Sequence, residues 1–236
     1  MLENLRAKPI KSKAIKDGKF ILNKNTPIQV AKKDDSCIVV LYEENEDETC
    51  YIHSQFNDDS FAIIGKEFYL NFYDDPAKVD LSYYYFSENK SVVVYLYDIK
   101  KTFSGIDVLI HLIGQWKSSI CDAKYCVNKT EEYNIDNQSD IHIGVITEDN
   151  NVEKRNQELQ KFLDPEPVPD KLPSYFKMQH QADSAADIRK RKLLSRFHEG
   201  KVIIDGQTYT YDIRLFDKKK HDMFFIDGVL NAAQIS

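Results

Sequence analysis

The chain has 236 residues, of which 42% are hydrophobic and 30% charged, with only 8 glycines and 7 prolines. This composition excludes a disordered chain and predicts one large globular domain, or a core with a smaller appendage. The formal net charge of -6 argues against a protein that coats nucleic acid nonspecifically, because that affinity comes from neutralising phosphates. It leaves room for a local basic groove.

Membrane and secretion signals are absent from the sequence. No run approaches the roughly 20 apolar residues of a membrane-spanning helix, and the first residues lack the apolar region of a signal peptide. We therefore expect a cytoplasmic protein without a membrane partner. The cysteines are too few and too irregularly spaced for a disulfide framework or a C-x-x-C zinc site, so we expect them to be reduced and mostly buried. They are Cys37, Cys50, Cys121 and Cys126.

The first 75 residues show strand-like patterns and no helical periodicity. Short β-rich runs alternate with polar turns, of which the acidic run at 43–48 is typical of a solvated loop. This part of the chain is therefore interpreted as a β-rich N-terminal region. The expected strands are 19–22, 28–31, 37–42, 49–53 and 61–72.

Two further β-rich runs follow, at 79–86 and 91–101, joined by a polar turn of hairpin length. The stretch 92–97 is continuously apolar, which is typical of a central strand buried on both faces. The sequence therefore predicts a hairpin whose second strand lies inside a sheet.

Helical periodicity begins near Ile106 and continues to about Tyr125, and a strand at 141–147 comes next. Strand, helix and returning strand predict a crossover that places the second strand parallel to the first. A charged helix at 152–163 ends this part of the chain.

A proline-rich stretch separates this core from the C-terminal part. Four of the seven prolines lie within 164–173, which favours an extended linker. Beyond it we expect a helix at 182–198 and a hairpin around Asp205-Gly206, the strongest turn signal in the chain. The predicted organisation is a β-rich region (1–75), a core (76–163), a linker (164–180), and a C-terminal helix with a hairpin (181–236).

Two aspartates and a lysine are the candidate catalytic residues. If the hairpin loop has three residues centred on Asn89, Asp80 lies directly opposite Asp98, with Cβ atoms about 4.5 to 5.5 Å apart. Such like charges are destabilising unless a cation compensates, and two carboxylates suit Mg²⁺, which keeps several waters. Lys100 projects from the same side as Asp98, within reach of a metal-bound water or a phosphate.

Asp80, then Asp98-Ile99-Lys100 at the end of an apolar strand, then an amphipathic helix and a further strand resemble the PD-(D/E)xK nuclease superfamily. That family includes restriction endonucleases, recombination nucleases and several bacterial anti-phage effectors. The resemblance implies that Asp80, Asp98 and the backbone carbonyl of Ile99 bind Mg²⁺ or Mn²⁺, and that Lys100 is the catalytic lysine. It also implies a mixed α/β fold with a restriction-endonuclease-like core, in which helices flank a mixed central sheet.

A polar stripe on the helix after the motif is a candidate nucleic-acid contact. His111 and Gln115 share it with Ser118 and Asp122, at helical spacing. The stripe either faces a substrate cleft or simply faces water. Trp116 is interpreted as a core residue rather than a base-stacking platform.

The most basic segment lies in the C-terminal helix. Arg189, Lys192 and Arg196 fall on one side, at i, i+3 and i+7, and form a candidate phosphate-tracking face. The alternative is an ordinary solvated helix face. The shorter cluster at 218–221 is interpreted as a turn between strands.

These observations favour a Mg²⁺-dependent endonuclease that hydrolyses DNA and is regulated through homo-oligomerisation or a partner subunit. A role in restriction or anti-phage defence is implied by the resemblance. The first alternative is a noncatalytic scaffold subunit that binds another protein through tyrosine-rich strands and the basic helix. The second is an RNA-directed nuclease, because recognition of the 2′-hydroxyl leaves no short motif.

Overall fold

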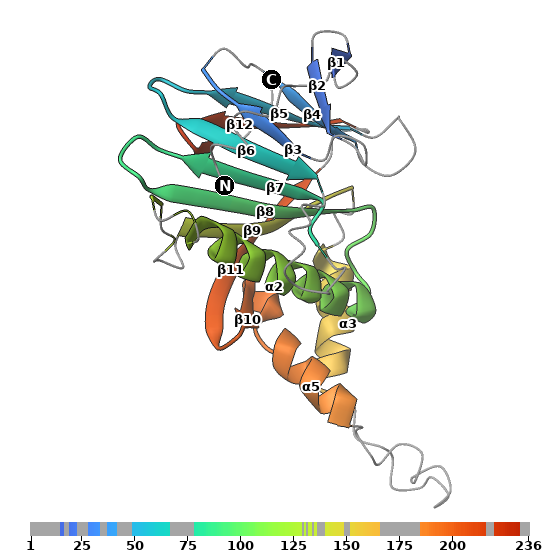
Figure 1. The fold of residues 1–236 in the computed structure, drawn as a ribbon. Coiled ribbons are helices and arrows are strands. Elements are labelled where there is room, and N and C mark those ends of the chain that lie inside the picture. The colour runs from blue at the N-terminus through green and yellow to red at the C-terminus, as the bar shows by residue number, and fades with distance from the viewer. Residues whose placement is uncertain are drawn as a thin grey trace, which may run out of the picture.

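The computed structural model shows three stacked layers, which are a six-stranded sheet, a seven-stranded sheet and a layer of helices (Figure 1). The predicted mixed α/β class is confirmed. The residues described are 15–16, 19–22, 28–33, 37–41, 49–66, 78–128, 130, 132–133, 135, 140–148, 152–165, 185–215 and 220–231.

The middle layer is a mixed sheet with the strand order β10-β11-β9-β8-β7-β6-β3. Strand β8 pairs in parallel with β9 and antiparallel with β7. The predicted central strand and its parallel return are therefore confirmed. The strands are β3 (Ile28–Ala31), β6 (Phe61–Lys66), β7 (Leu81–Phe86), β8 (Val92–Lys100), β9 (Ile141–Thr147), β10 (Lys201–Ile204) and β11 (Gln207–Leu215).

The outer sheet has the strand order β1-β2-β4-β5-β12-β13 and joins both ends of the chain. Strand β12 pairs in parallel with β5, while β3 and β6 belong to the middle sheet. The predicted N-terminal and C-terminal regions are thus interleaved in both sheets rather than separate units. The strands are β1 (Ile15–Lys16), β2 (Lys19–Leu22), β4 (Ile38–Leu41), β5 (Thr49–Gln55), β12 (Lys220–Ile226) and β13 (Val229–Asn231).

The helices lie on the face of the middle sheet that the outer sheet leaves open (Figure 1). Among the described residues, the other face of the middle sheet is covered by the strands of the outer sheet. The charged helix predicted at 152–163 is confirmed. The helices are α2 (Ile106–Asn128), α3 (Val152–Leu163), α5 (Ala185–Leu194) and a 3₁₀ turn at Phe197–Glu199.

The apolar run in β8 is explained by this layering. Successive side chains of a strand point to opposite faces of the sheet. Val94 and Leu96 pack in the core under the helices, whereas Tyr95 and Tyr97 pack in the core between the two sheets. Both faces of β8 are therefore buried, each against a different layer.

Both hairpins expected from turn chemistry are present. Strands β7 and β8 pair from Leu81 opposite Tyr97 to Phe86 opposite Val92, which is the register predicted from a loop centred on Asn89. Asp205 and Gly206 both have positive φ, 47° and 81°, as the tight turn between β10 and β11 requires.

Three expectations at loops and termini have different outcomes. The cluster at 218–221 is not wholly a turn, because Lys220 and His221 begin β12 and pair with β5. Much of the proline-rich linker and the end of the strand predicted at 61–72 lie outside the described residues. Within the described part of the chain, no helix is both long and apolar enough to cross a membrane.

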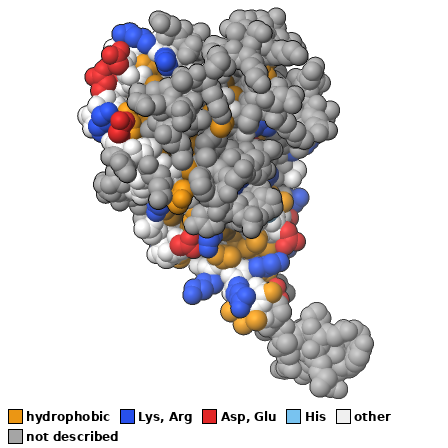
Figure 2. Space-filling model, in the orientation of Figure 1, with side chains coloured by type: hydrophobic (Ala, Val, Ile, Leu, Met, Phe, Trp, Pro, Cys, Tyr) orange, Lys and Arg blue, Asp and Glu red, His pale blue; other side chains and the backbone are white. Residues whose placement is uncertain are grey.

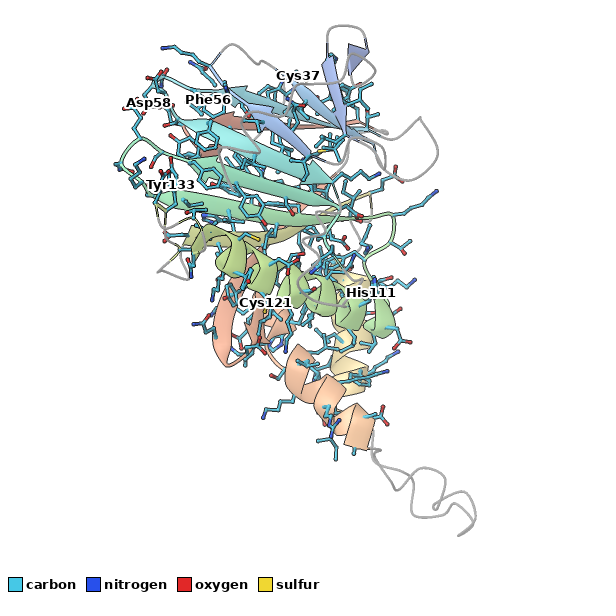
Figure 3. The ribbon with its side chains drawn as sticks, in the orientation of Figure 1. Cys37, Phe56, Asp58, His111, Cys121 and Tyr133 are labelled. Carbon is cyan, nitrogen blue, oxygen red and sulfur yellow. The ribbon has the colours of Figure 1, made fainter. Side chains whose placement is uncertain are left out.

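The four cysteines are free, as expected, but the prediction that most are buried is wrong. Only Cys50 is buried, and the other three are half-buried. Figure 3 shows Cys37 just before β4 of the outer sheet and Cys121 on α2 in the helical layer. Burial raises the pKa of Cys121, which argues against a nucleophilic thiolate there.

Gly144 on β9 allows two strands to pack closely. A Cβ at this position would lie 2.3 Å from Cε1 of Tyr97 and 3.0 Å from the backbone oxygen of Asp212. Because the Tyr97 ring is buried and its hydroxyl donates to Asp212 at 3.2 Å, it has little room to move. We expect Gly144→Ala to lower the free energy of unfolding by about 1–3 kcal/mol in urea titrations.

The matched control for this prediction is Gly114→Ala on α2, where an added Cβ meets nothing within 4 Å. Alanine is the better helix former, so this variant should be neutral or more stable. Equal losses of stability in the two variants would contradict the packing argument.

Candidate active site

Asp80 and Asp98 meet where β7 begins and β8 ends. Asp80 directly precedes β7, and the register of the pair continues to place it opposite Asp98. The Asp80 N–H donates to Oδ1 of Asp98 at 3.3 Å, and the Ile99 N–H donates to Oδ2 of Asp80 at 2.8 Å. The structure therefore brings the two predicted carboxylates together.

Lys100 completes the cluster from the same strand. Its Nζ contacts Oδ2 of Asp98, and its side chain is 22% exposed while that of Asp98 is 0% exposed. This contact is not the surface ion pair that would be expected if the two residues merely ended a strand. The lysine thus contacts a buried carboxylate, while part of its own side chain is exposed to solvent.

The environment of Asp98 disfavours its charged form. Burial is the main cause and the nearby Asp80 carboxylate the second, and together they raise the pKa of Asp98 to about 8, although Lys100 acts in the opposite direction. Two carboxylates held this close need additional positive charge to ionise together. The site is therefore suited to a cation.

Gln115, near the middle of α2, holds Asp98 from the helical layer. Its Nε2 donates to Oδ1 of Asp98 at 3.0 Å and to the backbone oxygen of Lys78 at 2.9 Å. Gln115 is 5% exposed, so the prediction that it contacts nucleic acid is not supported by its position. It orients a carboxylate instead.

The segment before Asp80 is fastened to α2 by a second set of polar contacts. Lys78 Nζ donates to Ser118 Oγ at 2.7 Å and lies 2.5 Å from Oδ2 of Asp122. The Val79 N–H donates to Ser119 Oγ at 3.1 Å. These contacts fix the backbone that delivers the Asp80 carboxylate.

Lys78 was not predicted from the sequence to have a role, and Asp122 was predicted only as a member of the polar stripe on α2. The available signal was the polar stripe on α2, which was expected to face either water or a cleft. Ser118 and Asp122 instead face inward and are buried, while His111 alone of the stripe is exposed (Figure 3). Trp116 is fully buried and donates to the Gly144 backbone oxygen at 3.2 Å, which confirms it as a core residue.

The donor set suits a hard dication. Among the described residues, no group of three or more His, Cys, Asp or Glu side chains could hold a metal ion. Mg²⁺ needs fewer, because it keeps several waters and binds through one or two carboxylates plus substrate phosphates. Asp80 and Asp98 meet that requirement. The N–H and C=O of a strand residue point to the same side, so the carbonyl of Ile99 is directed toward β7 and Asp80.

The predicted C-terminal helix ends earlier than expected, because α5 covers only Ala185–Leu194. Arg189 and Lys192 lie on this helix, whereas Arg196 lies beyond its end, next to the 3₁₀ turn. Arg189 and Lys192 are exposed, whereas Arg196 is held by Glu199 through Nε at 3.2 Å and Nη2 at 2.9 Å. Figure 2 shows Lys and Arg mixed with apolar side chains over this part of the molecule. A nucleic-acid contact through Arg189, Lys192 and Arg196, or through His111, stays a prediction.

The role of Gln115 is tested by Gln115→Leu, which keeps the approximate volume and removes both hydrogen bonds. We expect the affinity for Mg²⁺, measured by calorimetry, to fall roughly 10- to 100-fold, as for other residues that orient a metal ligand. Ser118→Ala is the matched control, because Ser118 is equally buried in α2 but contacts Lys78 rather than Asp98. A similar loss in both variants would indicate general disruption of the helix.

Comparisons of this chain with protein-family models, with curated proteins and with solved structures found no match.

Proposed function

We propose that this protein is a Mg²⁺-dependent nuclease that hydrolyses phosphodiester bonds of DNA. The observation that carries the proposal is the convergence of Asp80, Asp98 and Lys100 at the junction of β7 and β8. Burial of the Asp98 carboxylate beside a second carboxylate and a lysine lowers the stability of the folded protein. Such a cluster is suited to a metal-assisted reaction at phosphate, which accounts for its presence in the proposed nuclease.

Each residue has a defined task in this proposal. Asp80, Asp98 and the Ile99 carbonyl would hold the cation, which when bound supplies positive charge at the phosphate and lowers the pKa of a bound water. Asp80 is oriented by the Ile99 N–H, and Asp98 by Gln115 and the Asp80 N–H. Such bonds hold the carboxylates in place before the substrate arrives.

Lys100 is the residue that reaches solvent. Because it is partly exposed and contacts the buried Asp98, its ammonium group can approach a phosphate oxygen or the attacking water from outside. Its positive charge then stabilises the charge that develops in the transition state.

The proposal is tested by incubating the protein with plasmid, linear double-stranded DNA, single-stranded DNA and RNA, each with Mg²⁺, Mn²⁺ or EDTA. We expect cleavage of DNA with either metal and none with EDTA. Cleavage of RNA alone would favour the RNA-directed alternative with the same residues. Absence of cleavage of every substrate, together with no binding of Mg²⁺ by calorimetry, would overturn the proposal and favour a noncatalytic scaffold.

The biological setting is proposed from the resemblance alone. Nucleases of the PD-(D/E)xK type are common in restriction and anti-phage defence, and we propose that setting here. An unregulated nuclease is toxic, so activity is expected to depend on homo-oligomerisation or on a partner subunit. Cleavage that rises more steeply than in proportion to protein concentration would support regulation by self-assembly.

A further inference from the structure

Arg155 on α3 is a buried arginine that the proposed reaction does not use. The residue is 6% exposed, and its guanidinium carbon lies 4.9 Å from the centre of the Phe103 ring. Its positive charge lowers the pKa of Tyr211 against the larger upward effect of burial. The guanidinium therefore lies between the loop after β8 and the strand β11, in the helical layer.

One hydrogen-bond donor of this guanidinium is unmet within the described part of the chain. Nε of Arg155 is buried and has no hydrogen-bond partner there. Stacking on Phe103 uses the flat face of the group, whereas its five N–H donors lie in the plane and point outward. Burial of an unpaired charge costs several kcal/mol, so a protein normally supplies an anion to such a group.

The chain topology brings Arg155 to the edge of the sheet that carries the candidate active site. Lys100 pairs with Thr147 at the ends of the parallel strands β8 and β9. Phe103 follows Lys100 by three residues in the sequence, and α3 begins five residues after Thr147. Figure 1 shows α3 beside the end of α2 that follows β8. Ligands of α/β sheets bind beyond the carboxyl ends of parallel strands.

We propose that Arg155 and Phe103 form an anion subsite that binds a backbone phosphate of the nucleic acid, next to the phosphate that is cleaved. The planar guanidinium presents paired donors to phosphate oxygens, which is the geometry that arginine and phosphate share. The identity of the ligand rests on the proposed nuclease function, whereas the affinity of the guanidinium for an oxyanion does not.

The first test uses inorganic phosphate as the probe, in EDTA and at constant ionic strength against chloride. Phosphate should raise the melting temperature of the wild-type protein and of Asp98→Asn alike, because neither needs a metal for this binding. The rise should disappear in Arg155→Met and shrink in Arg155→Lys, which keeps the charge but loses the planar fork. Arg155→Lys also serves if Arg155→Met does not fold.

The matched control is Arg214→Met. Arg214 is a partly buried arginine of β11 whose Nε also lacks a well-directed hydrogen bond within the described residues, but it lies 2.8 Å from Oδ2 of Asp212. Because this carboxylate already balances the charge of Arg214, phosphate stabilisation should persist in the variant. The subsite is overturned if phosphate stabilises the wild type no more than chloride, or if it stabilises Arg155→Met and Arg155→Lys as much as the wild type.

The second test measures binding of a DNA oligonucleotide in Ca²⁺, as a function of salt concentration. Loss of one charge-assisted contact should weaken binding by Arg155→Met roughly 10- to 100-fold. The slope of log affinity against log salt should fall by about 0.7 to 0.9, the value for one phosphate contact. An unchanged slope with unchanged affinity would overturn the assignment to nucleic acid. Failure of cleavage in the wild type, with these effects intact, would instead overturn only the nuclease proposal.

Discussion

Asp98→Asn is expected to abolish metal-dependent cleavage, with a loss of at least about 100-fold, while the protein stays folded. Asparagine has nearly the same shape, and its Oδ1 can still accept the hydrogen bonds from Gln115 Nε2 and the Asp80 N–H. What it lacks is the negative charge that binds a dication. Plasmid nicking measures the loss of cleavage. A circular dichroism spectrum that matches that of the wild type shows that the variant is folded.

Metal binding gives this prediction a readout that does not depend on activity. Mg²⁺ at ten times its dissociation constant should stabilise the wild type by about 1.4 kcal/mol. The same concentration should not stabilise Asp98→Asn. Lys100→Ala should lose cleavage but keep much of the Mg²⁺ stabilisation, because the lysine is assigned to the water and the phosphate rather than to the metal.

The control for Asp98→Asn is Asp205→Asn, the same change at an exposed turn. Asp205 pairs with Lys117, and both side chains are 56% exposed, so this ion pair contributes little to stability. Asparagine before glycine also suits the turn. Full cleavage by Asp98→Asn, or equal loss in both variants, would contradict the assignment of Asp98 as a metal ligand.

Lys78→Met is expected to destabilise the protein by about 3–5 kcal/mol, the largest stability effect that we predict for a single substitution. The side chains of Lys78 and Asp122 are each 2% exposed and lie 2.5 Å apart. Removal of the lysine takes away the cation that lies against the buried Asp122 carboxylate. Chemical denaturation followed by circular dichroism measures the change in the free energy of unfolding.

The double variant Lys78→Met with Asp122→Leu separates the ion pair from general packing. Replacement of both charges by apolar groups of similar volume is often neutral or stabilising, so the double variant should recover most of the stability. Ser118→Ala, which removes only one hydrogen bond to Lys78, should cost roughly 1 kcal/mol. A loss below 1 kcal/mol in Lys78→Met would show that the pair does not hold the segment before Asp80.

These two predictions concern neighbouring networks that serve different purposes. The contacts of Lys78 with Ser118 and Asp122 fix the chain that leads into β7. The contacts of Asp98 with Gln115 and Lys100 arrange charges at the sheet edge. Because Gln115 also binds the Lys78 backbone oxygen, loss of the Lys78 side chain should weaken activity through the position of Asp80, whereas loss of the single Ser118 hydrogen bond leaves the ion pair with Asp122 to hold this segment.

Local sequence patterns determined most secondary structure of the described residues. The period of two in the strands and the helical period after Gly105 follow directly from backbone geometry. The loop around Asn89 set the register of β7 and β8, and with it the approach of Asp80 to Asp98. These features depend on residues close in the sequence, which is why they could be predicted without the fold.

Only the tertiary structure decided what each element packs against. Periodicity indicates that a face is buried, but not which layer covers it. The pairing of β12 with β5 and of β3 with β6 therefore could not be predicted from the sequence. The polar stripe of α2 was expected to meet water or substrate, because its partner Lys78 lies 40 residues from Ser118. A polar group is satisfied by whatever the fold places beside it, and that placement is a property of the packed layers rather than of neighbouring residues.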